Sequence, residues 1–193
     1  MSDRLASAVP LDAAFAIPFA CTGSIHHNLK AMWKIVPYSQ EHRDGVVHVV
    51  KSVFDEYGFT WEADGYCRDI YDPHQTYIEP GGMFWCAVEQ SPNDNLPPRV
   101  IGCAGVSFHD GYCELHRMYL LATCRGRGIG RALLNTCIEH ARRSGSRAIR
   151  AWSDVKLADA HRLYLRAGFV RDNQRICDDP DQSPEFGFWK EPP

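Results

Sequence analysis

The segment from residue 112 to residue 145 restricts the fold more than any other part of the chain. It begins with YCELHRMYLLA (112–122), which is rich in the aromatic and apolar residues of a strand. Three glycines follow in TCRGRGIG (123–130), and apolar residues then recur every four positions from Ile129 to Ala141. Gly145 is a typical helix end. The sequence therefore predicts a strand, a glycine turn and an amphipathic helix in direct succession.

The glycine turn also carries an unusual charge pattern. A helix N-terminus favours acidic residues, yet Arg125, Arg127 and Arg131 lie there, and no acid occurs in residues 123–134. Free backbone N–H groups, flexible glycines and arginines together favour a bound anion such as a pyrophosphate. The alternative is a surface helix with solvated arginines. A P-loop is excluded because no Gly-Lys-Ser/Thr occurs, and a GxGxxG dinucleotide motif is excluded because Arg131 replaces its last glycine.

The rest of the chain alternates between strand and helix patterns. Asp110-Gly111 between two apolar runs is a strong hairpin signal. A strand, a crossover helix and another strand in the second half imply one parallel pair in a mostly antiparallel sheet. Strands are expected at 32–38, 83–90, 99–109, 112–122, 147–155, 169–177 and 185–191, and helices at 39–59, 61–71, 129–145 and 156–169.

Composition removes several classes of function. A net charge of -3 argues against nucleic acid as a partner. Apolar runs fall short of the ~20 residues of a membrane helix, and no HExxH-like spacing suggests a metal. The 8 cysteines form no CxxC pair, which favours buried thiols in a reducing cytoplasm. The sequence leaves the choice between monomer and homodimer open.

The chain is expected to divide at residue 31. Residues 1–31 lack periodicity, and Pro10 and Pro18 interrupt them, so they are expected to form a weakly structured extension. Residues 32–193 form the predicted domain, and Met32 is a candidate translation start.

Two motifs carry a resemblance to a known family. The first is the pattern [RQ]xxGx[GA], which Arg125, Gly128 and Gly130 fit. The second is Axx-Leu-Tyr-xxx-Gly-Phe, which AHRLYLRAGF (160–169) fits, and its Tyr164 follows Gly130 by 34 residues. On both motifs, residues 32–193 resemble the GCN5-related N-acetyltransferase (GNAT) superfamily. The resemblance implies an α/β (α+β) fold with a mixed, mostly antiparallel sheet of about seven strands, a central parallel strand pair and helices on both faces.

The resemblance also implies a function. The chain is expected to move an acetyl group from acetyl-CoA, as cosubstrate, to a primary amine by direct transfer, with no metal. Tyr164 is the expected proton donor to the departing thiolate, although a core tyrosine on an amphipathic helix is the alternative. The expected acetyl-CoA contacts are Met118, Tyr119, Leu120, Arg125, Gly126, Arg127, Gly128, Ile129, Gly130 and Arg131.

The base that deprotonates the amine is less defined. Glu114 and His116 share one strand face by the period of two, and Arg117 is expected on the other face. Either Glu114 or His116 is a candidate base, directly or through water; the alternative is an ordinary sheet pair. Many family members carry Asn where this chain has Leu157. The nearby Asp154 and Asp159 are candidates to replace it.

Residues 55–80 are expected to line the acceptor pocket. They combine acids such as Asp69 with aromatics such as Tyr66 and Tyr77, a mixture suited to a cationic amine. The alternative is a solvated helix face over an aromatic core. Two rival functions remain at this stage: a non-catalytic acyl-CoA-binding or sensing module, and a structural domain whose arginines bind phosphate in a partner.

Overall fold

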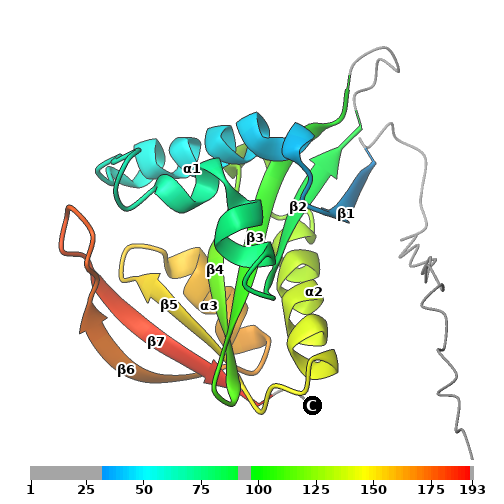
Figure 1. Ribbon diagram of the computed structural model, residues 1–193. Coiled ribbons are helices and arrows are strands. Elements are labelled where there is room, and N and C mark those ends of the chain that lie inside the picture. The colour runs from blue at the N-terminus through cyan, green and yellow to red at the C-terminus, as the bar shows by residue number, and fades with distance from the viewer. Residues whose placement is uncertain (1–31, 91–96, 192–193) are drawn as a thin grey trace, which may run out of the picture. The chain divides into compact units, whose positions relative to one another are not determined.

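The computed structural model describes residues 32–90 and 97–191, so the predicted extension at 1–31 lies outside the described residues. Seven strands form one sheet in the order β1-β2-β3-β4-β5-β7-β6 (Figure 1). All neighbouring described strands are antiparallel except β4 and β5, as the crossover pattern predicts. The strands are β1 (Trp33–Pro37), β2 (Met83–Glu89), β3 (Arg99–His109), β4 (Tyr112–Leu120), β5 (Ile149–Asp154), β6 (Val170–Ile176) and β7 (Pro184–Lys190).

Helices cover both faces of the sheet. The apolar stripe of α1 (Arg43–Tyr57) shares one core with Phe84, Cys86 and Val88 of β2. The helices α2 (Ile129–Arg143) and α3 (Ala158–Arg166) contribute to a second core that contains Trp85 and Ala87. Since successive residues of a strand point to opposite faces, the two cores lie on opposite sides of β2 (Figure 1). The predicted fold class is confirmed.

Glycines set the turns that join these elements. Gly111 in the β3–β4 hairpin has φ of 86°, and Gly145 and Gly168, beyond the ends of α2 and α3, have φ of 75° and 84°. A side chain is strained in this left-handed region, which explains why glycine stands at each helix end. The hairpin at Asp110-Gly111 and both helix ends agree with the sequence prediction.

The predicted helix at 61–71 is wrong. A 3-10 turn spans Arg68–Tyr71 and a π-helical turn spans His74–Ile78. Pro73 separates them, and proline at that position lacks the N–H that a continuing helix needs. Cys67, Ile70 and Tyr77 are nevertheless buried against the α1 side of the sheet, so packing holds this irregular segment in place.

A bulge in β4 changes the direction of its later side chains. Cys103 of β3 pairs with Tyr119, and Gly105 pairs with His116, so Arg117 and Met118 together face one residue, Ala104. The extra residue is Arg117, whose φ of 47° is unusual for a side chain other than glycine. The expectation that Arg117 points away from His116 is therefore wrong, because the bulge interrupts the period of two.

Candidate active site

The strands β4 and β5 separate soon after they begin to pair. Their parallel register covers only Cys113–Leu115, whereas β4 stays paired with β3 as far as Leu120 (Figure 1). The Leu121 N–H donates to the Ile101 carbonyl of β3 at 3.0 Å. Because N–H groups alternate in direction along a strand, the Leu120 N–H points away from β3, into the opening toward β5. This opening offers an extended ligand a strand edge to lie against.

The glycine turn presents a second set of backbone donors. Gly126 and Gly128 have φ of 74° and 82°, and a Cβ added to either would meet no atom within 4 Å. Gly128 is the N-cap of α2 without a side-chain cap, and the first turn of α2 has no acidic residue. The first N–H groups of a helix have no partner within the helix, so this end fits a phosphate group.

Two of the three arginines in this turn have carboxylate partners elsewhere in the chain. Arg125 forms two bonds to Glu56 at the end of α1, at 2.6 and 2.7 Å. Arg127 lies 2.7 Å from Glu89 of β2. Arg131 is exposed. Although no acid occurs in residues 123–134, the fold brings carboxylates from distant parts of the chain to Arg125 and Arg127.

Tyr164 lies beside the opening on the α2–α3 side of the sheet. Its hydroxyl is 3.9 Å from the Met118 Sδ of β4, and its ring packs on Phe169 and Phe188. Burial raises the pKa of Tyr164, so the phenol is protonated at neutral pH. The side chain thus meets both expectations, as a buried core residue and as a proton-bearing group next to the Met118–Leu120 edge. Its catalytic role stays a prediction.

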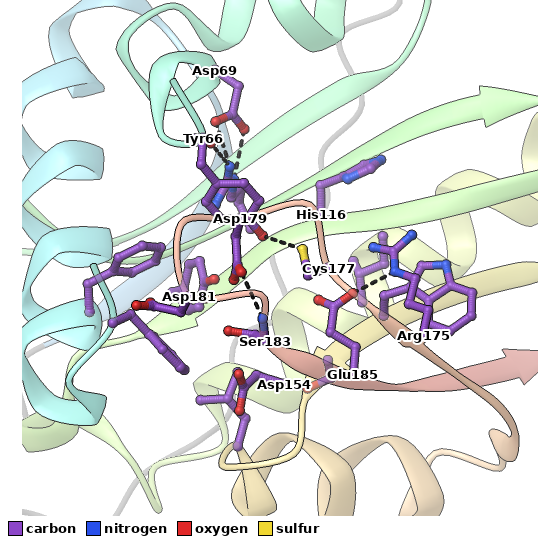
Figure 2. Close-up of a pocket in the computed structure, with 18 of the residues that line it drawn as sticks. Tyr66, Asp69, His116, Asp154, Arg175, Cys177, Asp179, Asp181, Ser183 and Glu185 are labelled. Atoms are coloured by element: carbon purple, nitrogen blue, oxygen red, sulfur yellow. Dashed lines mark hydrogen bonds and ion pairs between the residues drawn. The ribbon is translucent and has the colours of Figure 1, made fainter. Parts of the chain in front are cut away.

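The other side of β4 forms one wall of a cavity of about 290 Å³ (Figure 2). Glu114, His116, Arg117 and Tyr119 all line it. The bulge makes this possible, since without it Arg117 and Tyr119 would alternate away from His116. The structure thus brings both candidate bases to a common space with residues of the 59–77 segment.

His116 is held as a neutral group in this wall. Its Nε2 is 2.8 Å from the Ser107 hydroxyl and 3.8 Å from a Glu114 oxygen, and its ring lies 5.4 Å from that of Tyr77. Burial, reinforced by the charge of Arg117, lowers the pKa of His116 to about 4. A neutral imidazole accepts a proton, but a low pKa makes it a weak base. Its role and that of Glu114 stay predictions.

Arg117 connects β4 to the irregular segment. Its Nε and Nη2 each donate to Asp69 at 2.8 Å, Nη2 also donates to the Tyr66 carbonyl, and the guanidinium lies 4.4 Å from the centre of the Tyr66 ring. Asp69 in turn accepts from the Tyr77 hydroxyl. These contacts hold the left-handed residue of the bulge in place. Tyr66, Asp69 and Tyr77 of the 55–80 segment line the cavity as expected. Glu56, from the same segment, forms an ion pair with Arg125 instead.

Sequence reasoning missed the wall formed by β6, β7 and their connection. Arg175 donates to Glu185 at 2.6 Å, and Asp179 accepts from the Ser183 N–H at 2.8 Å (Figure 2). Asp181 accepts from both the N–H and the hydroxyl of Thr60, beyond the end of α1. The acids in ICDDPDQ (176–182) are a signal of this wall. A connection without periodicity, however, does not reveal which strands it faces.

The residues near the family's asparagine position occupy different environments. Leu157 is the N-cap of α3 and lines the cavity. Asp159 is on the exposed surface of α3 and pairs with Arg162. Asp154 is only 7% exposed and lines the cavity. Among residues 32–90 and 97–191, no group of three or more His, Cys, Asp or Glu side chains is arranged to hold a metal.

Comparison with known proteins identifies the family. The model of the acetyltransferase (GNAT) family matches residues 50–169, which include the glycine turn, the cavity wall on β4 and Tyr164. The chain belongs to this family. None of the helices within the described residues has the length and apolar character to cross a membrane.

Relatives and solved structures agree with this assignment. The chain is 29% identical over 133 residues to an uncharacterized N-acetyltransferase, YjgM, of Escherichia coli K12, a match over 64% of this chain and 74% of that one. It is 31% identical over 118 residues to an IAA acetyltransferase of Azospirillum brasilense, covering 56% and 72% of the two chains. A GNAT acetyltransferase structure from Staphylococcus aureus Mu50 superposes with a TM-score of 0.70 at 18% identity, over 84% and 100% of the chains. That similarity concerns the fold.

Proposed function

We propose that this protein transfers an acetyl group from acetyl-CoA directly to a primary amine. The observation that carries the proposal is the free edge of β4 at Met118–Leu120, in the opening between β4 and β5. This edge lies between a helix N-terminus suited to phosphate and a cavity lined by acids and aromatics. A long anionic donor and a small amine can thus reach the same point from two sides.

Acetyl-CoA is held, in this proposal, by two sets of groups. The N–H groups of residues 126–131, with Arg125, Arg127 and Arg131, bind the pyrophosphate. The backbone of Met118, Tyr119 and Leu120 accompanies the pantetheine arm. Because the same guanidinium nitrogens of Arg125 would donate to both groups, the pyrophosphate must either displace the Glu56 carboxylate or share these donors with it.

The reaction then has defined proton steps. The acceptor ammonium loses one proton to a base, and its nitrogen attacks the thioester carbonyl carbon. A C–N bond forms and the C–S bond breaks. Tyr164 gives its hydroxyl proton to the thiolate, and the second proton leaving the nitrogen restores the phenol through solvent. The Leu120 N–H donates to the oxygen that gains charge, a kind of contact whose loss costs about 3 kcal/mol in other enzymes.

Glu114 and His116 remain the candidates for the base. An alkyl ammonium has a pKa of about 10.4, so it must be deprotonated at neutral pH. The Glu114 oxygen and the His116 nitrogen lie on the same cavity wall, and a water between either group and the amine would carry the proton. Both side chains are partly exposed, with fractions of 16% for Glu114 and 29% for His116.

An amine screen tests the proposal. The purified chain is mixed with acetyl-CoA and a library of amines, free thiol is measured, and acetylated products are identified by mass spectrometry. We expect thiol release that depends on an amine. Binding of acetyl-CoA by calorimetry without transfer to any amine would instead support the non-catalytic acyl-CoA-binding alternative.

A further inference from the structure

Asp154 stands out among the cavity residues that the proposed reaction does not use. It ends β5 and is only 7% exposed. Its Oδ1 accepts from the Lys156 N–H at 2.7 Å, whereas its Oδ2 is buried and has no hydrogen-bond partner in the described part of the chain. Figure 2 shows the carboxylate directed toward Ser183, into the cavity. A buried charged oxygen without a partner is costly, so this site favours a positively charged ligand.

The position of Asp154 at the end of β5 places it beside the opening between β4 and β5. Leu115 of β4 pairs with Ala151 of β5 in the last paired position. Asp154 lies three residues further along β5, beyond the last paired position and beside the opening. Glu114, by contrast, stands opposite Arg150 in the backbone register of the paired part of the sheet. Asp154 thus borders the opening between β4 and β5 in which the acetyl group is proposed to lie.

The charge of the whole lining points to the same kind of ligand. Six carboxylates and two arginines line the cavity. Both arginines are already paired, Arg117 with Asp69 and Arg175 with Glu185. Within the described residues, the carboxylates without an arginine partner are Glu114, Asp154, Asp179 and Asp181. An acceptor that carries its own carboxylate would add a further negative charge to this surplus.

We propose that Asp154 binds the ammonium group of the acceptor and that this acceptor is a small cationic amine without a carboxylate, of the aliphatic diamine class. This inference rests on the proposed function. The Lys156 N–H holds one oxygen of Asp154, which leaves the other to accept from the ammonium. The remaining surplus of carboxylates attracts a second positive charge on the same molecule, and the rings of Phe59 and Tyr66 pack against its alkyl chain.

Three amines of equal chain length separate the charge requirements. Putrescine carries two ammonium groups, n-butylamine carries one, and γ-aminobutyrate has a carboxylate in place of the terminal aminomethyl group of putrescine. We expect kcat/KM for acetyl transfer to fall in that order. If γ-aminobutyrate is acetylated as well as putrescine or better, the cationic acceptor class is overturned, and the Arg117 Nη1, which also lacks a partner in the described residues, becomes the candidate carboxylate-binding group.

Asp154→Asn tests the residue, because Asn keeps the shape and can still accept from the Lys156 N–H. A hydrogen bond to a charged group contributes enough that its loss should raise the KM for putrescine about 10- to 100-fold. The Kd of acetyl-CoA should change less than about twofold, which is under about 0.4 kcal/mol. Glu139→Gln, at an exposed ion pair of α2, removes the same charge far from the cavity and should change neither constant.

The outcomes separate this inference from the proposed function. An unchanged KM for putrescine in a folded Asp154→Asn variant overturns the role of Asp154 while acetyl transfer stands. Titration of putrescine into the CoA-bound wild-type protein gives a second readout, which does not require the variant to fold. Binding of putrescine there without any transfer upholds the site and contradicts the proposed activity, and no binding overturns the inference.

Discussion

Replacement of Glu56 by Gln should strengthen the binding of acetyl-CoA. Both terminal nitrogens of Arg125 donate to the Glu56 carboxylate. A pyrophosphate that uses the same nitrogens must first displace this carboxylate. A glutamine side chain at this position would offer only a neutral acceptor, so the arginine would be available to the ligand at a lower cost.

The size of the effect follows from the exposure of the pair. The side chains of Arg125 and Glu56 are 29% and 34% exposed, so solvent screens their attraction. Pairs of this kind contribute about 0.2–1 kcal/mol, and the bidentate geometry favours the upper end. A gain of about 1 kcal/mol corresponds to a Kd about fivefold lower. Added salt should reduce the difference between variant and wild type.

Two controls isolate the mechanism. Asp55→Asn changes the net charge by the same amount one residue earlier, at an exposed position, and therefore reports general electrostatic attraction. Acetyl-pantetheine lacks the pyrophosphate, so Glu56→Gln should leave its affinity unchanged. Calorimetry measures all these constants. A weaker affinity for acetyl-CoA in Glu56→Gln would refute the competition and show that Glu56 instead orients Arg125 for the ligand.

Four further outcomes follow from the structure. Tyr164→Phe should lower kcat about 10²–10⁴-fold with little change in acetyl-CoA affinity, because the ring and its packing remain; an unchanged kcat in steady-state thiol release rules out the acid role. Asp69→Asn breaks a buried ion pair and should cost about 3–5 kcal/mol in urea unfolding, and a loss well below that range would mean that Arg117 finds other partners. His116 has a folded pKa of about 4, against an unfolded value of about 6.5, so its contribution to stability is present above pH 6.5 and is lost as pH falls toward 4. His116→Gln should therefore flatten the dependence of the free energy of unfolding on pH in this range, and an equal dependence in both proteins contradicts the burial argument. A chain that begins at Met32 should keep its melting temperature and acetyl-CoA affinity, and a large drop in either would show that residues 1–31 contribute to the fold.

Local patterns predicted most of the fold because they encode local preferences. The apolar runs in residues 83–90 and 99–109, the Asp110-Gly111 turn and the four-residue spacing after Ile129 all correspond to observed elements. The helix prediction at 61–71 failed because tertiary packing buries Cys67 and Ile70 and partly buries the aromatic residues without a continuous helix around them.

The site depended on features that no single segment contains. The bulge at Arg117 arises from the count of residues on two strands, so the sequence of β4 did not reveal that Arg117 and His116 share a face. Glu56 reaches Arg125 from 69 residues away, and Asp181 reaches Thr60 from 121 residues away. By contrast, the glycine turn and Tyr164 were found from sequence because their motifs are short and contiguous.

The three-residue contact between β4 and β5 gives the sheet a weak seam. On one side of the seam lie β1 to β4, and the glycine turn follows β4 and leads into α2. On the other side lie β5 to β7, with Asp154 at the end of β5 and the acidic connection between β6 and β7. A donor and an acceptor seated in the opening would bridge these two halves and supply contacts that the backbone itself does not make. Occupancy of the site should therefore slow amide hydrogen exchange across both halves of the sheet together, so that the substrates act as a missing part of the architecture.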